Sequence, residues 1–391
     1  MKLSALDVQE WQGKVQREEA TVVVENVTLI TEFIFVGLSN DRKTRIVLFV
    51  VILLTYTLTI MGNLAVITLV RSDSHLQTPM YYFLMHLSCL EICYVTCTEP
   101  QMLAHLLAGK GAISFTRCMV QILAAMLMGA AECSLLAVMA YDRYLAICQP
   151  LLYPVAMGRW QQMLLASSCW AIGLFFGTVF VGCALRHSYC GPNRMNHFMC
   201  ELPVVLQLAC DDTHTTEVVV FALSALGILI PISIILISYA VILFSVLQIR
   251  SATGWHKAFS TCASHLVVVT LFYGTLVSMY LIPRSAASSD RGKHISVFYV
   301  VVTPLLNPVI YTLRNKDIHQ AVGRVLRRGG VVTHSTWGHF IRLTISPTAG
   351  SPLFKSHAGS WAPHISKRHC TAGRGRWGFT SLPLLALALR E

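Results

Sequence analysis

The chain has 391 residues, of which 54% are hydrophobic and 13% are charged, and its mean hydropathy is +0.59. Soluble domains usually carry about 25% charged residues, so this composition excludes an ordinary soluble protein. The net charge of +11 would suggest nucleic-acid binding, but six of these charges lie beyond residue 328, where seven Lys and Arg stand against one Glu. We therefore expect no nucleic-acid partner, because no basic stripe interleaved with aromatic residues occurs in the rest of the chain.

The first segment, residues 1–45, contains no apolar stretch of the kind found in a cleaved signal peptide. Lys2 is followed by mixed, charged residues, and we expect the first membrane helix to act as the insertion signal. Asn26 begins the sequence Asn-Val-Thr, which is an acceptor site for N-glycosylation. The site lies just before the first apolar segment, which favours an extracellular N-terminus.

Seven apolar segments follow, and a bilayer is crossed by about 20 apolar residues in a helix. The segments are 46–70, 80–104, 118–146, 162–184, 217–248, 258–282 and 295–313. Lipid cannot hydrogen-bond the backbone, so each segment should be a helix. The predicted fold class is an all-α membrane protein with a seven-transmembrane helix bundle over residues 46–313. Four prolines should kink these helices, namely Pro100, Pro231, Pro304 and Pro308.

Lys and Arg usually accumulate in cytoplasmic loops. Between residues 42 and 328, however, ten of them fall on each side of the predicted bundle, so charge does not decide the orientation. The glycosylation site and the loop cysteines favour an N-terminus outside. Residues 314–328 are then expected to form a short cytoplasmic amphipathic helix. Residues 329–391 mix Gly, Ser, Pro and basic residues without a period, which predicts a disordered cytoplasmic tail.

Two carboxylates, Glu91 and Glu132, lie midway along the second and third segments among apolar neighbours. Two such groups close together cannot both ionise without a cation, and otherwise one of them stays protonated. Asn63 and Asn307 are expected to complete a polar network with them. For Asn63, a simple hydrogen bond between helices is an equally good interpretation.

Four of the 13 cysteines lie outside the apolar interior: Cys118 begins the third segment, and Cys190, Cys200 and Cys210 occupy the loop before the fifth. Four cysteines allow three disulfide pairings, and disulfides suit an oxidising exterior. An alternative is a metal site at His197, Cys200 and Glu201. It is less favoured, because a disulfide-bonded sulfur is not the thiolate that a metal requires.

Four sequence strings, each on its own apolar segment, carry a resemblance to a known family. They are QTPMYYFL at 77–84, MAYDRYLAIC at 139–148, KAFSTCASH at 257–265 and PLLNPVIY at 304–311. In this order they resemble the olfactory receptor family, a branch of the rhodopsin-like G-protein-coupled receptors. The resemblance covers about residues 26–328. The second and third strings are specific to odorant receptors, whereas the fourth alone would indicate the wider superfamily.

The resemblance implies a multi-pass receptor of the plasma membrane, surrounded by lipids, and not an enzyme. It implies an odorant ligand and a heterotrimeric G protein of the stimulatory or olfactory type, acting through cyclic AMP. It also implies a Cys118–Cys200 disulfide, which leaves Cys190 and Cys210 as a second pair. A sodium ion is implied between Glu91 and Glu132, although the family more often has Asp at position 91, which puts the ion geometry in question.

Activation should involve side chains at the cytoplasmic ends of the helices and in the seventh segment. The resemblance implies a joint rearrangement of Asp142, Arg143, Tyr144, Tyr239, Lys257, His265, Asn307, Pro308 and Tyr311. We expect Arg143 to be held in an ion pair with Asp142 and, once released, to meet the G protein. Ordinary interfacial packing is the alternative for Tyr239 and His265.

The ligand pocket is expected between the outer halves of the third, fifth and sixth helices. Helical spacing of three and four residues relates Met126, Gly129, Ala130 and Cys133 on the third helix, and Phe272, Tyr273, Leu276 and Tyr280 on the sixth. All of these except Phe272 are the seven residues predicted to bind the ligand. Such stripes also fit plain bundle core. The predicted ligand is small, largely apolar and volatile, because the stripes contain no acidic anchor of the kind that captures amines.

Two other functions compete with an odorant receptor. A secondary transporter would usually show internal repeats and paired broken helices, which the sequence does not contain. An enzyme is disfavoured because no HExxH, GxSxG or P-loop string occurs. The remaining alternative is the same receptor fold in a non-olfactory chemosensory role, which the site of expression would discriminate.

Overall fold

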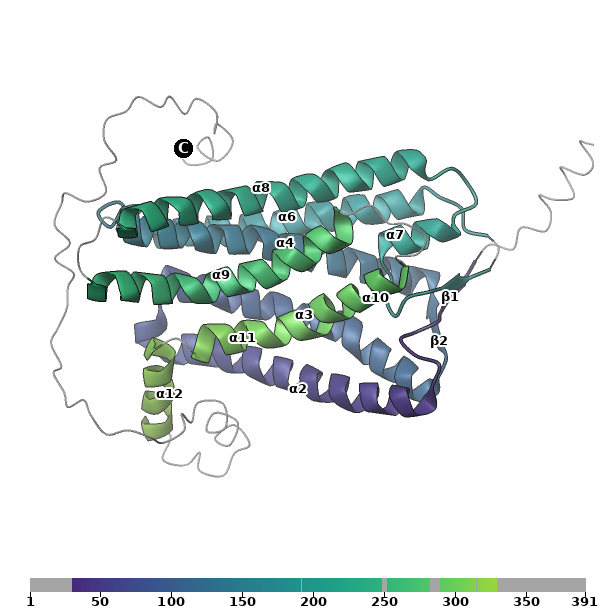
Figure 1. The fold of residues 1–391 in the computed structure, drawn as a ribbon, viewed down its shortest axis with the longest axis horizontal. Coiled ribbons are helices and arrows are strands. Elements are labelled where there is room, and N and C mark those ends of the chain that lie inside the picture. The colour runs from purple at the N-terminus through teal and green to yellow at the C-terminus, as the bar shows by residue number, and fades with distance from the viewer. Residues whose placement is uncertain (1–29, 191, 248–251, 282–288, 314–315, 329–391) are drawn as a thin grey trace, which may run out of the picture.

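The computed structural model describes residues 30–190, 192–247, 252–281, 289–313 and 316–328. Its long helices run roughly along one axis, with a small sheet at one end of the bundle and the short helix α12 lying across the axis at the other (Figure 1). The expectations for Asn26 and for residues 329–391 fall outside the described part of the chain.

The predicted helices are all present, and most begin or end a few residues beyond the apolar segments. They are α2 (Arg42–Ser72), α3 (Pro79–Ala108), α4 (Phe115–Cys148), α6 (Arg159–Leu185), α8 (His214–Leu247), α9 (Ala252–Tyr280), and a seventh made of α10 (Ser289–Val297), a π-helical turn (Phe298–Val302) and α11 (Thr303–Leu313). Within the described residues, six helices are long and apolar enough to cross a membrane, and His265–Tyr280 of α9 is a shorter apolar helix. The predicted seven-helix fold class is confirmed.

The helix ends follow local chemistry. The Asp41 side chain accepts a hydrogen bond from the backbone N–H of Thr44 at 2.8 Å and so caps α2, which satisfies a donor at the open end of the helix. Pro79 occupies the first turn of α3, where a missing N–H costs nothing. The same helix ends at Gly109, whose φ of 73° is a left-handed conformation that glycine adopts without strain.

The prolines lie within the helices as predicted. Pro100, Pro231 and Pro308 are inside α3, α8 and α11. Pro304 lies in the first turn of α11, directly after the π-helical turn Phe298–Val302. A π-helical turn shifts the hydrogen-bond register by one residue, so it changes which side chains of the seventh helix face the bundle.

Close packing of α6 against α4 depends on two glycines. A Cβ atom at Gly173 would lie 2.3 Å from the carbonyl oxygen of Leu127, and one at Gly177 would lie 2.8 Å from that of Leu123. Small residues let two membrane helices approach closely and gain van der Waals contact. The pair therefore fixes α6 beside the central helix α4.

One end of the bundle carries a three-stranded sheet that the sequence analysis did not predict. Strand β1 (Glu32–Phe35) pairs antiparallel with β2 (Gly111–Ser114) and parallel with β3 (Arg194–Met195), in the order β2-β1-β3. Two of the strands have four residues and the third has two, at or below the lower limit of the four to eight residues over which alternation indicates a strand. Their pairing joins the N-terminal segment to two loops distant in sequence.

At the opposite end, the described residues form three short helices, which are Ser74–Leu76, α5 (Tyr153–Ala156) and α12 (Lys316–Arg328). Helix α12 coincides with the amphipathic helix predicted for residues 314–328, apart from residues 314–315, which are not described. The Nε atom of Arg324 lies 2.7 Å from Oδ2 of Asp73. The backbone N–H of His75 and the Arg324 guanidinium lower the pKa of Asp73 to about 2, so an ionised carboxylate ties α12 to the loop after α2.

Candidate functional site

A cavity of about 70 Å³ opens among four helices and the π-helical turn. On the same kind of measure, one water molecule needs about 10–15 Å³, so the cavity has room for several waters or a small organic molecule. The lining side chains are mostly apolar. They are Ala125, Met126, Gly129, Ala130, Cys133, Phe176, Phe180, Ser224, Gly227, Ile228, Leu276, Tyr280 and Tyr299.

The cavity brings together six of the seven residues predicted to bind ligand, which are Met126, Gly129, Ala130, Cys133, Leu276 and Tyr280. Tyr273 does not line it. Its hydroxyl donates a hydrogen bond to the carbonyl oxygen of Cys133 at 2.9 Å, so this side chain joins α9 to α4 instead. Phe272 is also buried outside the cavity lining. Ligand binding by the six lining residues stays a prediction.

The pocket was expected beside the fifth helix, α8, but no residue of that helix was named, and the contributions of α6 and the seventh helix were not predicted. Ser224, Gly227 and Ile228 on α8 follow the three-and-four spacing of a helix face, so a search of the fifth segment could have found them. Phe176 and Phe180 on α6 are four residues apart, but lipid-facing aromatic residues have the same spacing. Tyr299 lies in the π-helical turn, whose position no sequence period indicates.

A polar network lies deeper in the bundle. The amide nitrogen of Asn307 donates to Glu91, and it lies 3.3 Å from Oε1 of Glu132. These three residues come together as predicted. Asn63 does not join them, because its amide donates to the carbonyl oxygen of Thr59 on its own helix at 3.0 Å. Neither interpretation offered for Asn63 is therefore correct.

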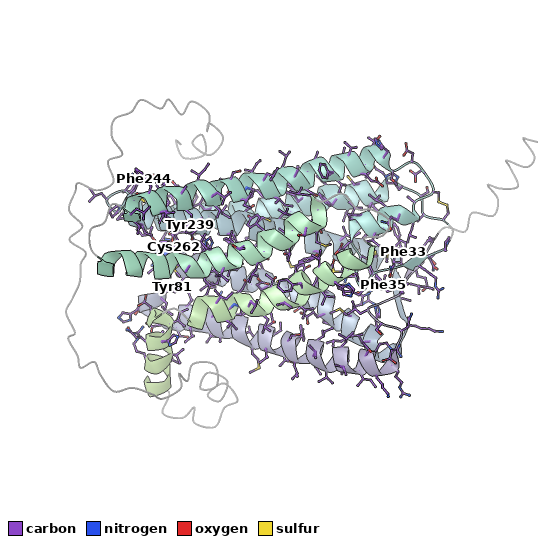
Figure 2. The ribbon with its side chains drawn as sticks, viewed as in Figure 1. Phe33, Phe35, Tyr81, Tyr239, Phe244 and Cys262 are labelled. Carbon is purple, nitrogen blue, oxygen red and sulfur yellow. A yellow bond between two sulfur atoms is a disulfide. The ribbon has the colours of Figure 1, made fainter. Side chains whose placement is uncertain are left out.

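The ends of α8 and α9 that lie opposite the sheet are linked by a buried hydrogen bond. The hydroxyl of Tyr239 lies 2.7 Å from Nδ1 of His265, and the His265 and Tyr311 ring centroids are 6.4 Å apart. Figure 2 shows Tyr239 and Cys262 at this end of the bundle. Pro308 packs against α2, since a Cβ at Gly62 would lie 3.2 Å from its Cγ atom. The side chain of Lys257 is outside the described set.

The predicted ion pair between Asp142 and Arg143 is wrong. Asp142 is buried and accepts a hydrogen bond from the Tyr153 hydroxyl at 2.9 Å, and no ion pair joins it to Arg143 among the described residues. Neighbouring residues on a helix do not face each other. Arg143 is half-buried, and Tyr144 packs beside Tyr141 with ring centroids 6.2 Å apart.

Both predicted disulfides are present. Cys118–Cys200 has a Cα–Cα distance of 5.5 Å and Cys190–Cys210 one of 5.7 Å. The first joins the start of α4 to the loop before α8, and the backbone N–H of Cys200 also donates to the Gln121 side chain at 2.9 Å. The alternative metal site fails, because Cys200 is bonded to Cys118 and no metal-ligand cluster of three occurs in the described ranges.

Comparison with known proteins agrees with this architecture. A family model described as olfactory receptor matches residues 52–328. The chain belongs to the olfactory receptor family. It is 46% identical to human olfactory receptor 2D2 over 303 residues, which cover 78% of this chain and 98% of that receptor. It is 45% identical to mouse olfactory receptor 5AP2 over 302 residues, or 77% and 95% of the two chains.

A third relative, human olfactory receptor 11L1, is 47% identical over 312 residues, which are 80% of this chain and 97% of that receptor. Membership in the family makes this olfactory receptor a multi-pass membrane protein that responds to odorants and couples to a G protein. The family is one of receptors rather than enzymes. The cavity and the buried polar contacts are thus places where a receptor could bind and respond to ligand.

Proposed function

We propose that a small, largely apolar volatile molecule binds in the cavity bounded by α4, α6, α8, α9 and Tyr299, and that binding activates a stimulatory, olfactory-type G protein. The observation that carries this proposal is the cavity itself. Its wall combines residues from several helices that are far apart in sequence, and it contains no Asp, Glu, Lys, Arg or His. A ligand there contacts several helices at once, which is what a shift between two helix arrangements requires.

Helix α9 connects the cavity to the cytoplasmic end. Leu276 and Tyr280 line the cavity, Tyr273 binds the Cys133 carbonyl, and His265, about two turns further along, contacts Tyr239. A ligand that binds better when α9 is displaced would weaken the Tyr273 and His265 contacts together. The G protein would then meet the cytoplasmic surface around Arg143.

We also propose that the N-terminus faces the outside of the plasma membrane. The two disulfides lie at the end of the bundle that carries β1, β2 and β3, and disulfides persist in an oxidising exterior. Exposed apolar side chains of α8, such as Leu236, Ile237 and Phe244, would contact membrane lipids. A protease or glycosidase applied to intact cells tests this orientation.

The functional proposal is tested with an odorant panel and a cyclic-AMP reporter. Arg143→Ala should abolish agonist-driven cyclic AMP while the receptor remains detectable at the cell surface. Arg159→Ala is the matched control, because Arg159 is exposed at the start of α6. Normal signalling by Arg143→Ala at the surface would contradict the role of Arg143.

A sodium ion bound near Glu91 and Glu132 remains a separate proposal. Their carboxylates and the amide oxygen of Asn307 are oxygen donors, the type that hard cations prefer. Glu91→Gln and Glu132→Gln should each shift basal activity or agonist potency, and the double mutant should not show the sum. Sodium titration should change potency in the unmutated receptor. Additive effects without any sodium dependence would make the pair a packing feature.

A further inference from the structure

Ser224 places a hydroxyl group in the wall of the otherwise largely apolar cavity. The residue is on α8, is 8% exposed, and lines the cavity together with Gly227 and Ile228 one turn away. Across the described residues, its hydroxyl makes no hydrogen bond with the protein. A buried hydroxyl without a partner is unfavourable, so this group is available to a ligand.

Two other serines in these helices behave differently. Ser233, also on α8, donates to the carbonyl oxygen of Leu229 at 2.7 Å, and Ser278 on α9 donates to that of Gly274 at 2.8 Å. Such bonds to the preceding turn are the usual way in which a serine in a membrane helix is satisfied. Ser224 makes no such hydrogen bond to the preceding turn among the described residues, although α8 offers it a carbonyl oxygen four residues earlier, as it does to Ser233.

The other polar side chains of the wall interact with protein groups or are weak donors. Tyr280 has an interaction partner within the protein, and Tyr299 interacts with Tyr94 and Tyr280. The Cys133 side chain is a thiol, which is a weak hydrogen-bond donor. Glu201 is outside the lining, where it accepts a hydrogen bond from Ser296 at 2.9 Å. An ammonium or carboxylate ligand would therefore lose its hydration without gaining a charged partner.

We propose that this cavity selects neutral molecules that carry a hydrogen-bonding oxygen, such as ketones, aldehydes and alcohols, and that Ser224 is the residue that recognises that oxygen. This inference rests on the proposed function, because it takes the cavity as the odorant site. The oxygen of the ligand would accept from the Ser224 hydroxyl, while Met126, Ile228 and Leu276 contact its apolar body. A hydrocarbon of the same shape would leave the hydroxyl unpaired and bind more weakly.

The test uses a carbon-matched panel and the cyclic-AMP reporter at neutral pH. The linear set is 1-hexanol, hexanal, 2-hexanone, hexane, hexylamine and hexanoic acid. The cyclic set is cyclohexanol, cyclohexanone, cyclohexane, cyclohexylamine and cyclohexanecarboxylic acid. Agonists should come from the neutral oxygenated compounds. Ser224→Ala should weaken their potency roughly threefold to tenfold, the range of one hydrogen bond, and Ser233→Ala should leave it unchanged at equal surface expression.

A third variant, Gly129→Leu, separates the two proposals. No atom lies within 4 Å of a Cβ built at Gly129, so the longer side chain should fill the cavity and abolish the response. A response that survives Gly129→Leu contradicts the cavity as the odorant site and, with it, the inference. A response lost in Gly129→Leu but unchanged in Ser224→Ala overturns the inference alone. It is overturned equally if the hydrocarbons, amines or acids are the stronger agonists, or if no neutral oxygenated compound activates the receptor.

Discussion

The hydroxyl of Tyr153 donates a hydrogen bond to Oδ1 of Asp142 at 2.9 Å, and this contact joins the short helix α5 to the C-terminal end of α4. Asp142 is 1% exposed, so it depends on a partner from the protein. The contact leaves the neighbouring Arg143 outside any ion pair with Asp142. The loop between α4 and α6, rather than an ion pair within α4, therefore holds the carboxyl group.

Tyr153→Phe should destabilise this end of the receptor, because it removes the donor and leaves a buried carboxyl group unsatisfied. A hydrogen bond to a charged group contributes roughly 1.5–3 kcal/mol. Thermal inactivation of the purified receptor should occur at a lower temperature. Tyr141→Phe is the control, since Tyr141 is half-buried and its hydroxyl has no partner among the described contacts. Equal stability of the two variants would refute the assignment.

The ion pair between Arg324 and Asp73 predicts a stability effect that does not vary near neutral pH. Asp73 has its pKa lowered from 3.8 to about 2, so its contribution is complete above pH 3.8 and is lost as pH falls through about 2. Arg324→Gln should lower the melting temperature by the same amount at pH 5.5 and pH 7.5. The control is Gln320→Ala on the exposed face of α12. A loss that changes between the two pH values would point to a different titrating partner.

Because α6 packs closely against α4, we expect two glycines of α6 to differ in whether they tolerate substitution by a larger residue. Gly173→Val should prevent folding, because a Cβ there meets the Leu127 carbonyl oxygen at 2.3 Å, whereas nothing lies within 4 Å of a Cβ at Gly182. Overpacking typically costs about 1–3 kcal/mol and more when backbone must move. Surface expression measured by flow cytometry should collapse for Gly173→Val and persist for Gly182→Val. Similar expression of both would mean that α6 packs differently.

The two disulfides should differ in their effect on stability. Cys118 and Cys200 are 82 residues apart and Cys190 and Cys210 are 20 apart, and a cross-link restricts the unfolded chain more when its loop is longer. The expected losses are about 4–5 and about 3 kcal/mol. Cys118→Ser, Cys200→Ser and the double mutant should show the same surface expression, and Cys183→Ser should show little loss. Additive losses from the two single mutants would mean that they are not partners.

The sequence alone determined the seven helices, the family motifs, the candidate disulfide cysteines and the pair Glu91 and Glu132. Each of these depends on the length of an apolar segment or on a few adjacent residues, because a bilayer imposes helices on any sufficiently long apolar run. Six of the seven ligand-binding candidates, four on the third helix and two on the sixth, also followed from spacing and line the cavity.

The tertiary structure decided every feature that depends on where distant side chains point. Tyr273 shares the helical spacing of Leu276 but turns to the Cys133 carbonyl, because helix α4 lies within reach of its hydroxyl. The Asp142 carboxylate accepts a hydrogen bond from Tyr153 and does not pair with its neighbour Arg143, since the side chains of consecutive residues on a helix point in different directions. The Ser224 hydroxyl likewise lines a cavity that α4, α6, α8 and α9 enclose. No local sequence pattern predicts how these four helices are arranged.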